Sequence, residues 1–107
     1  MTEQNKTRRQ KLEDFLAKNP NDTFTRYGIA LECVKEGDLP AAESHFKALI
    51  QANPEYVPGY QMWAQTLAQN DRPEDAKTVL TQGIQAAIRA GNQHARTEME
   101  GLLADLG

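Results

Sequence analysis

The side chains that could act as nucleophiles or metal ligands in this chain are few and scattered. Cys33 is the only cysteine, and His45 and His94 are the only histidines among the 107 residues. A catalytic cysteine needs a basic partner or a helix N-terminus to lower the pKa of its thiol, and neither lies near Cys33 in the sequence. A metal site needs ligands at short, fixed spacing, which these three residues lack. We therefore expect no catalytic residues, no metal site and no cofactor, and predict that the protein is not an enzyme.

Each of these side chains also has a structural interpretation. Cys33 falls on an apolar helical stripe, where it is predicted to be a small buried filler. His45 lies beside Glu43 and Ser44, on what we expect to be the solvated face of its helix. A single cysteine allows no internal disulfide, which favours a reducing compartment and predicts a cytoplasmic protein.

The charge pattern argues against a nucleic-acid partner. The chain has 15 acidic and 12 basic residues, with a net charge of +2 over residues 1–20 and −5 over the rest. A duplex binder needs a basic face, and the one basic stretch, residues 6–11, is interrupted by polar residues. No apolar run approaches the roughly 20 residues needed to cross a bilayer, and no apolar leader follows the basic N-terminus. We expect neither nucleic acid nor membrane as a partner.

The sequence repeats with a period of 34 residues. The pairs Asn19-Pro20 and Asn53-Pro54 are separated by 34 residues. The same shift places apolar residues on apolar residues: Ala42 on Ala76, Phe46 on Leu80, and Ile50 on Ile84. Regular self-similarity of this length is typical of repeat proteins, in which each unit covers the apolar face of its neighbour.

Within one period the apolar spacing predicts two helices. Ala42, Phe46, Leu49 and Ile50 follow the i, i+4, i+7, i+8 pattern of one helix face. Residues 36–40 and 70–73 carry turn chemistry with a proline placed early in the next helix. Asp71 and Glu74 also fit a capping box at the start of a helix. No segment favours β structure.

A helix-turn-helix unit of this length resembles the tetratricopeptide repeat. In the first copy, the places of the pattern W-x2-L-G-x2-Y, A-x3-F, P are held by Arg26, Ile29, Ala30, Cys33, Ala42, Phe46 and Pro54. In the second copy, the same places are held by Tyr60, Trp63, Ala64, Leu67, Ala76, Leu80 and Ile88. Arg26 replaces a large aromatic residue, and Ile88 replaces the closing proline, so the last long helix should continue to Ala90-Gly91. The resemblance implies an all-α protein, a right-handed α-solenoid of antiparallel helix pairs.

The expected organisation is a single domain, 1–107, of about six helices. Its parts are a half-repeat helix (7–20), two full repeats (21–54 and 55–91) and a capping helix (92–107). Arg8 stands where the full repeats have alanine, which indicates a side open to water. Gly91 is expected to end the preceding helix and Asn92 to cap the last one.

The resemblance implies that first helices of successive repeats line a groove for a peptide or a partner's helix. The groove positions here are an apolar row, Phe24, Tyr27, Leu31 and Val34, and a more polar row, Pro58, Gln61, Gln65 and Ala68. Apolar side chains of a partner would be buried against the first row, while its backbone amides would meet Gln61 and Gln65.

Two alternatives concern this row. Phe24 and Tyr27 could instead pack as core residues on the half-repeat helix, against Leu12, Phe15 and Leu16. Some relatives hold a partner's C-terminal carboxylate with lysine, arginine and asparagine, but this chain has Tyr27, Leu31, Met62 and Gln65 around those places. A carboxylate clamp is therefore not expected.

The sequence thus predicts a non-catalytic module for protein–protein interaction, an adaptor or scaffold that binds another protein. The alternative is a structural module that self-associates, for example as a homodimer, by pairing its truncated ends between chains.

Overall fold

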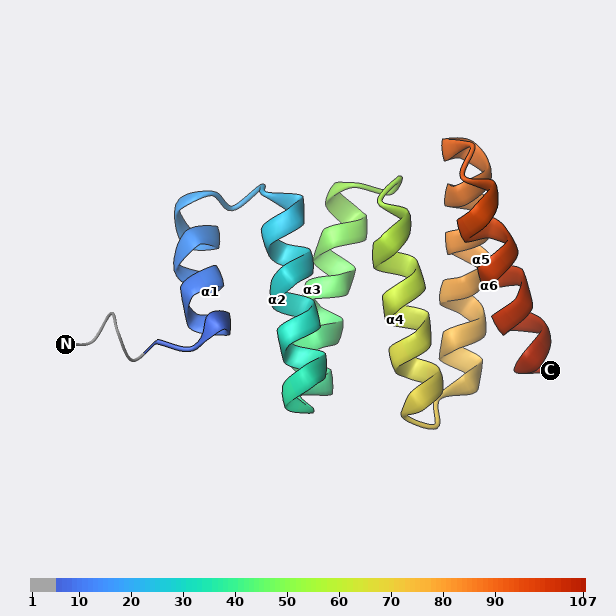
Figure 1. Cartoon of the computed structure of the whole chain (residues 1–107), viewed down its shortest axis with the longest axis horizontal. Coiled ribbons are helices and arrows are strands. Elements are labelled where there is room, and N and C mark those ends of the chain that lie inside the picture. The colour runs from blue at the N-terminus through green and yellow to red at the C-terminus, as the bar shows by residue number, and fades with distance from the viewer. Residues whose placement is uncertain (1–5) are drawn as a thin grey trace. The chain divides into compact units, whose positions relative to one another are not determined.

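The computed structural model describes residues 6–107, which form six α-helices and no strand (Figure 1). The helices are α1 (Arg8–Lys18), α2 (Thr23–Glu36), α3 (Leu39–Ala52), α4 (Val57–Gln69), α5 (Pro73–Ala90) and α6 (Gln93–Asp105). The predicted all-α class is confirmed. The first five residues of the predicted domain lie outside the described part. None of the helices within residues 6–107 is long and apolar enough to cross a lipid bilayer.

The chain divides into two compact units, Met1–Ala52 with α1 to α3 and Asn53–Gly107 with α4 to α6. In unit 1, α2 and α3 form a helix pair around a core that includes Ile29 and Phe46, both fully buried. Ala30 and Ala42 are fully buried as well, so small residues stand where the repeat pattern requires close packing. Each large apolar side chain in such a core contributes about 1.5–3 kcal/mol.

Helix α1 is attached to this pair by apolar and charged contacts. Leu16 is buried, and a Cβ added to Gly28 would lie 3.5 Å from Cδ1 of Leu12, an ordinary packing distance. The guanidinium of Arg9 donates hydrogen bonds to Glu36 (2.8 Å) and Asp38 (3.3 Å), which lie around the turn between α2 and α3. Because these bonds are ionic, they hold α1 more firmly than neutral ones would.

Unit 2 is built around a close approach of three helices at Gly83 in α5. A Cβ at this position would lie 2.6 Å from Cβ of Tyr60 in α4 and 2.7 Å from Sδ of Met99 in α6. Both distances are well below ordinary carbon contacts of about 3.5–4.0 Å. Glycine therefore allows α4 and α6 to pack closely on the same stretch of α5.

The helix ends show one correct prediction and one error. Gly91 ends α5 in the left-handed conformation (φ 69°), and Oδ1 of Asn92 accepts a hydrogen bond from the Ala95 amide (3.0 Å). The predicted capping box at Asp71 and Glu74 is wrong, because the N-cap of α5 is Arg72 and no side chain caps it.

Asp71 has a different role, in the turn that follows α4. Its φ of 59° lies in the left-handed region, and the next amide, that of Arg72, donates to the carbonyl of Leu67 (3.0 Å). Asp71 therefore helps to end α4 and does not begin α5. A capping box is present instead at Thr7 and Gln10, at the start of α1.

Candidate interaction surface

The reactive side chains of unit 1 are shielded. Cys33 is fully buried, and burial raises the pKa of its thiol, so the reactive thiolate is disfavoured. Residues 6–107 contain no group of three or more His, Cys, Asp or Glu side chains placed to hold a metal ion. Cys33 is therefore a packing residue, as the sequence predicts.

The prediction that His45 is solvated is wrong, because its side chain is half-buried. Its Nδ1 lies 3.3 Å from a guanidinium nitrogen of Arg26, whose other nitrogen donates to the carbonyl of Pro20 (3.4 Å). Burial and the positive charge of Arg26 lower the pKa of His45. Arg26, which replaces the large aromatic residue of the repeat pattern, thus contacts His45 of α3.

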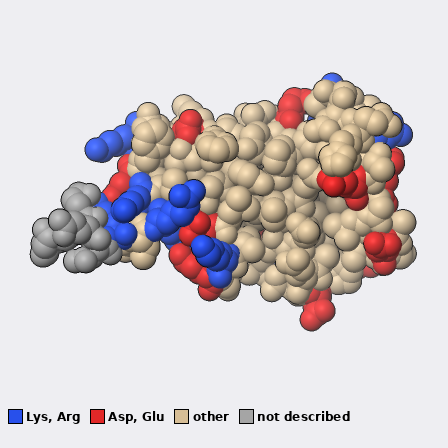
Figure 2. Space-filling model, in the orientation of Figure 1, with Lys and Arg blue, Asp and Glu red and all other residues tan. Residues whose placement is uncertain are grey.

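The basic stretch at the N-terminus forms ion pairs within unit 1. Figure 2 shows Lys and Arg side chains gathered over α1, beside Asp and Glu side chains. Lys6 pairs with Asp14, and Arg8 pairs with Glu32 (3.1 Å). These pairs make a mixed surface of both signs and not a continuous basic one.

The apolar row predicted on α2 is only partly covered. Phe24 is 75% exposed, so it is not the core residue of the alternative interpretation. Tyr27, Leu31 and Val34 are half-buried, and burial raises the pKa of the Tyr27 hydroxyl. Phe15 of α1 is also exposed, at 51%. Unit 1 thus presents large apolar side chains to solvent.

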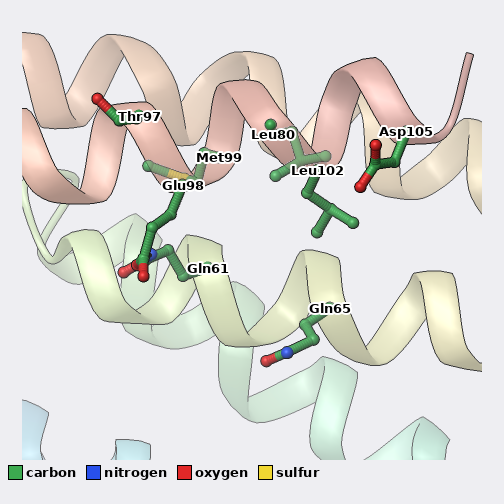
Figure 3. Close-up of a pocket in the computed structure, with 9 residues that line it drawn as sticks. Gln61, Gln65, Leu80, Thr97, Glu98, Met99, Leu102 and Asp105 are labelled. Atoms are coloured by element: carbon green, nitrogen blue, oxygen red, sulfur yellow. The ribbon is translucent and has the colours of Figure 1, made fainter.

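Gln61 and Gln65 of the polar row on α4 line a cleft in unit 2, between α4 and α6 (Figure 3). The cleft has a volume of about 460 Å³. Its lining residues are Gln61, Gln65, Leu80, Thr97, Glu98, Met99, Gly101, Leu102 and Asp105. Nε2 of Gln61 donates to a carboxylate oxygen of Glu98 across the cleft (3.0 Å), whereas Gln65 is exposed.

One face of α6 forms the second wall of this cleft. Glu98, Gly101, Leu102 and Asp105 follow the i, i+3, i+4, i+7 spacing of a single helix face. The sequence predicts only a capping role for the last helix, so these residues are not among the predicted site residues. The signal that points to them is that two carboxylates share the helix face of Leu102.

The floor of the cleft is apolar. Leu80 of α5 is fully buried and Met99 of α6 is 2% exposed, while Leu102 points into the gap between α4 and α6 (Figure 3). A Cβ added to Gly101 would meet no atom within 4 Å, so the wall there is open. An apolar floor beneath amide and carboxylate groups is suited to a peptide, which has both apolar and polar groups to place.

Comparisons with known proteins agree with this fold. The family model for tetratricopeptide repeats matches residues 34–106. A solution NMR structure of a tetratricopeptide repeat domain protein from Salinibacter ruber is 31% identical, with a TM-score of 0.76, and the match covers 81% of this chain and 88% of that one. A crystal structure of such a protein from Salinibacter ruber is 30% identical, with a TM-score of 0.71, covering 79% of this chain and 94% of that one.

A solution structure of a protein from Bordetella parapertussis shares the fold at 22% identity. Its TM-score is 0.80, and the match covers 94% of this chain and 88% of that one. Among curated proteins, none matches the chain significantly.

Proposed function

The chain belongs to the tetratricopeptide repeat family, and we propose that it is a non-catalytic module that binds a peptide segment or a helix of another protein. Repeats of this family generally mediate protein–protein interaction. The observation that carries the proposal is the cleft between α4 and α6, which is lined by Gln61 and Gln65 and has an apolar floor. This combination supports recognition of a peptide backbone together with an apolar side chain.

In unit 1 we assign the corresponding contact surface to the α2 row, Phe24, Tyr27, Leu31 and Val34. The exposed ring of Phe24 supports this assignment, because it presents apolar area that no contact within unit 1 covers. Burying one large apolar side chain contributes about 1.5–3 kcal/mol before the costs of association. A few such anchors give micromolar affinity, which suits an adaptor or scaffold.

The division of the chain into repeats is part of the same proposal. The repeats extend over residues 21–54 and 55–91, between the half-repeat helix 7–20 and the capping helix 92–107. The protein acts in the cytoplasm, which the lone, buried Cys33 supports, since a reducing compartment keeps such a thiol free.

Site-specific photo-crosslinking in cells tests the proposal. A photoreactive phenylalanine analogue replaces Gln65 in one variant and Leu31 in another, while a third variant carries it at Gln82, which is exposed on α5 away from the cleft. The Gln65 and Leu31 probes should capture the same protein and the Gln82 probe should not. Capture from Gln82 alone would place the binding surface elsewhere.

The captured partner then allows a direct measurement. Tyr27→Ala combined with Leu31→Ala should weaken its binding more than tenfold, while far-UV helicity changes little. Both side chains are only half-buried, so their removal costs the core less than it costs the contact surface. Unchanged affinity would contradict the assignment of the α2 row.

Self-association is the second candidate function, and the exposed ring of Phe15 on α1 supports it. Sedimentation at several concentrations should then show a mass that increases with concentration. Leu12→Asp with Leu16→Asp should dissociate the assembly if α1 is exchanged between chains, but unfold a monomer if α1 packs within its own chain.

A further inference from the structure

Unit 2 has more acidic side chains than basic ones. Residues 53–107 contain seven Asp and Glu and four Lys and Arg. Each of the four bases forms an ion pair: Arg72 with Asp75, Lys77 with Glu74, Arg89 with Glu55, and Arg96 with Glu100. Of the acidic residues outside these pairs, Glu98 and Asp105 line the cleft and Asp71 lies in the α4–α5 turn.

The cleft therefore carries negative charge that its own unit does not neutralise with Lys or Arg. Glu98 accepts a hydrogen bond from Gln61, and its other oxygen lies 3.2 Å from the exposed ring of His94. The lining of the cleft contains no basic residue, all of its residues lying within the described part of the chain. A segment with an acidic group would meet two carboxylates there.

We propose that the cleft between α4 and α6 selects a partner segment with two basic side chains that flank an apolar one. This inference rests on the proposed function, because it names the chemistry of the segment bound at the same cleft. Complementary charge gives specificity by attracting the correct segment and by repelling acidic ones.

The spacing of the wall residues defines the motif. Glu98 and Asp105 are seven residues apart on α6, which corresponds to about 10 Å along the helix. Basic residues at i and i+3 of a polyproline II segment share one face and are about 9 Å apart, because that conformation has three residues per turn. Residues at i and i+7 of a helix also share a face and are about 10 Å apart. Between the carboxylates lie Leu102 and the open wall at Gly101, where an apolar side chain of the segment is accommodated.

The opposite wall completes the contact. The amide group of Gln65 is exposed on α4, one turn after Gln61, and has both donor and acceptor atoms for a peptide backbone. Gln61 holds Glu98 in position from this wall, as Figure 3 shows. The amides on α4 thus recognise the backbone of the segment, and the carboxylates on α6 recognise its basic side chains.

Selection from a random 12-residue peptide library tests this inference with the full chain as bait. The wild-type chain is compared with Glu98→Gln/Asp105→Asn, which removes both charges of the cleft. The matched control, Asp71→Asn/Glu74→Gln, changes the net charge equally at exposed positions outside the cleft. The most enriched peptide is then synthesised, and its affinity for all three proteins is measured by calorimetry at low and high salt.

Peptides selected on the wild-type chain should be enriched in Lys or Arg at positions three or seven apart, with an apolar residue between. The cleft variant should bind the synthesised peptide about fivefold more weakly, the loss typical of two partly exposed ion pairs, and the control should bind it as the wild type does. Added salt should weaken wild-type binding because it screens the charges.

Two outcomes would overturn the inference. Selected peptides that lack basic residues would do so, and so would basic peptides whose affinity is equal for all three proteins. If peptides without basic residues still bind at the cleft, only the charge preference fails and the proposed function stands. If the wild-type chain retains no peptide and the photo-crosslinking probes capture no protein, the proposed function fails.

Discussion

Gly83→Ala is the substitution for which the structure makes the sharpest stability prediction. The new methyl group would lie 2.6 Å from Cβ of Tyr60 and 2.7 Å from Sδ of Met99. Sδ of Met99 belongs to a flexible side chain and is able to move, but Cβ of Tyr60 is fixed to the backbone of α4. Relief of the contact therefore requires α4 and α5 to separate by about 1 Å, since ordinary carbon contacts are about 3.5–4.0 Å.

Two opposing effects set the size of the change. Alanine is favoured over glycine inside a helix by about 1 kcal/mol. Overpacking a tight core costs about 1–3 kcal/mol, and a clash with a backbone-anchored atom places the cost near the upper end. We therefore expect Gly83→Ala to lower the free energy of unfolding of unit 2 by about 2 kcal/mol.

Gly101→Ala is the matched control, because the chemical change is the same and the site is also helical. A Cβ at Gly101 would meet no atom within 4 Å, so only the helix propensity changes and stability should increase by about 0.5–1 kcal/mol. Urea unfolding is followed by far-UV circular dichroism and by the fluorescence of Trp63, the only tryptophan, which is buried in α4.

The two variants should differ by about 3 kcal/mol, with the wild type between them. A Gly83→Ala protein as stable as the wild type, or more stable, would refute the close approach of the three helices at Gly83. An equal gain in both variants would show that helix propensity alone acts at both sites.

Three further predictions concern unit 1. Cys33 should react with a thiol reagent at pH 8 only as fast as the chain unfolds, because it is buried and its pKa is raised; rapid modification of the native protein would contradict its place in the core. The pKa of His45 is lowered mainly by burial and by Arg26, is raised less strongly by Glu13, and is lowered least by Arg9. The unfolded chain therefore binds a proton at His45 more readily than the folded chain does. Stability should accordingly be lost as the pH falls from about 6.5 through the lower pKa that His45 has in the folded chain. His45→Gln should reduce this loss, measured as urea midpoints at pH 7.5 and 5.5, and an equal loss in both proteins would show that another group is responsible. Arg9→Gln should increase amide hydrogen exchange in α1 more than in α2, because its ion pairs to Glu36 and Asp38 attach α1 to the turn after α2; no change in α1 exchange would contradict that role.

Periodicity made most of the fold predictable from the sequence. The alanines at 30, 42, 64 and 76 are fully buried, as expected for close packing between helices. Gly91 and Asn92 act as the sequence predicts because helix caps depend on local residue types. Such features need no knowledge of distant contacts.

The features that were missed depend on contacts that the sequence does not place. His45 is half-buried and contacts Arg26, 19 residues earlier in the chain. Asp71 adopts a left-handed conformation to close the α4–α5 turn, although its spacing to Glu74 favours a cap.

The cleft itself was only half predicted. The repeat pattern predicts that Gln61 and Gln65 lie on a binding surface, but it does not predict the other wall of the cleft. That wall depends on how closely α6 packs on α5 at Gly83, and neither a glycine nor an amphipathic helix reveals this distance on its own.

Whether a peptide binds in the cleft between α4 and α6 is tested by locating the bound segment on the full chain. A titration with the most enriched library peptide, followed by ¹⁵N–¹H correlation spectra, reports on every backbone amide. The largest shifts should occur at Gln61, Gln65, Leu102 and Asp105. Shifts largest at exposed α5 residues such as Gln82, with the cleft amides unmoved, would contradict binding in the cleft.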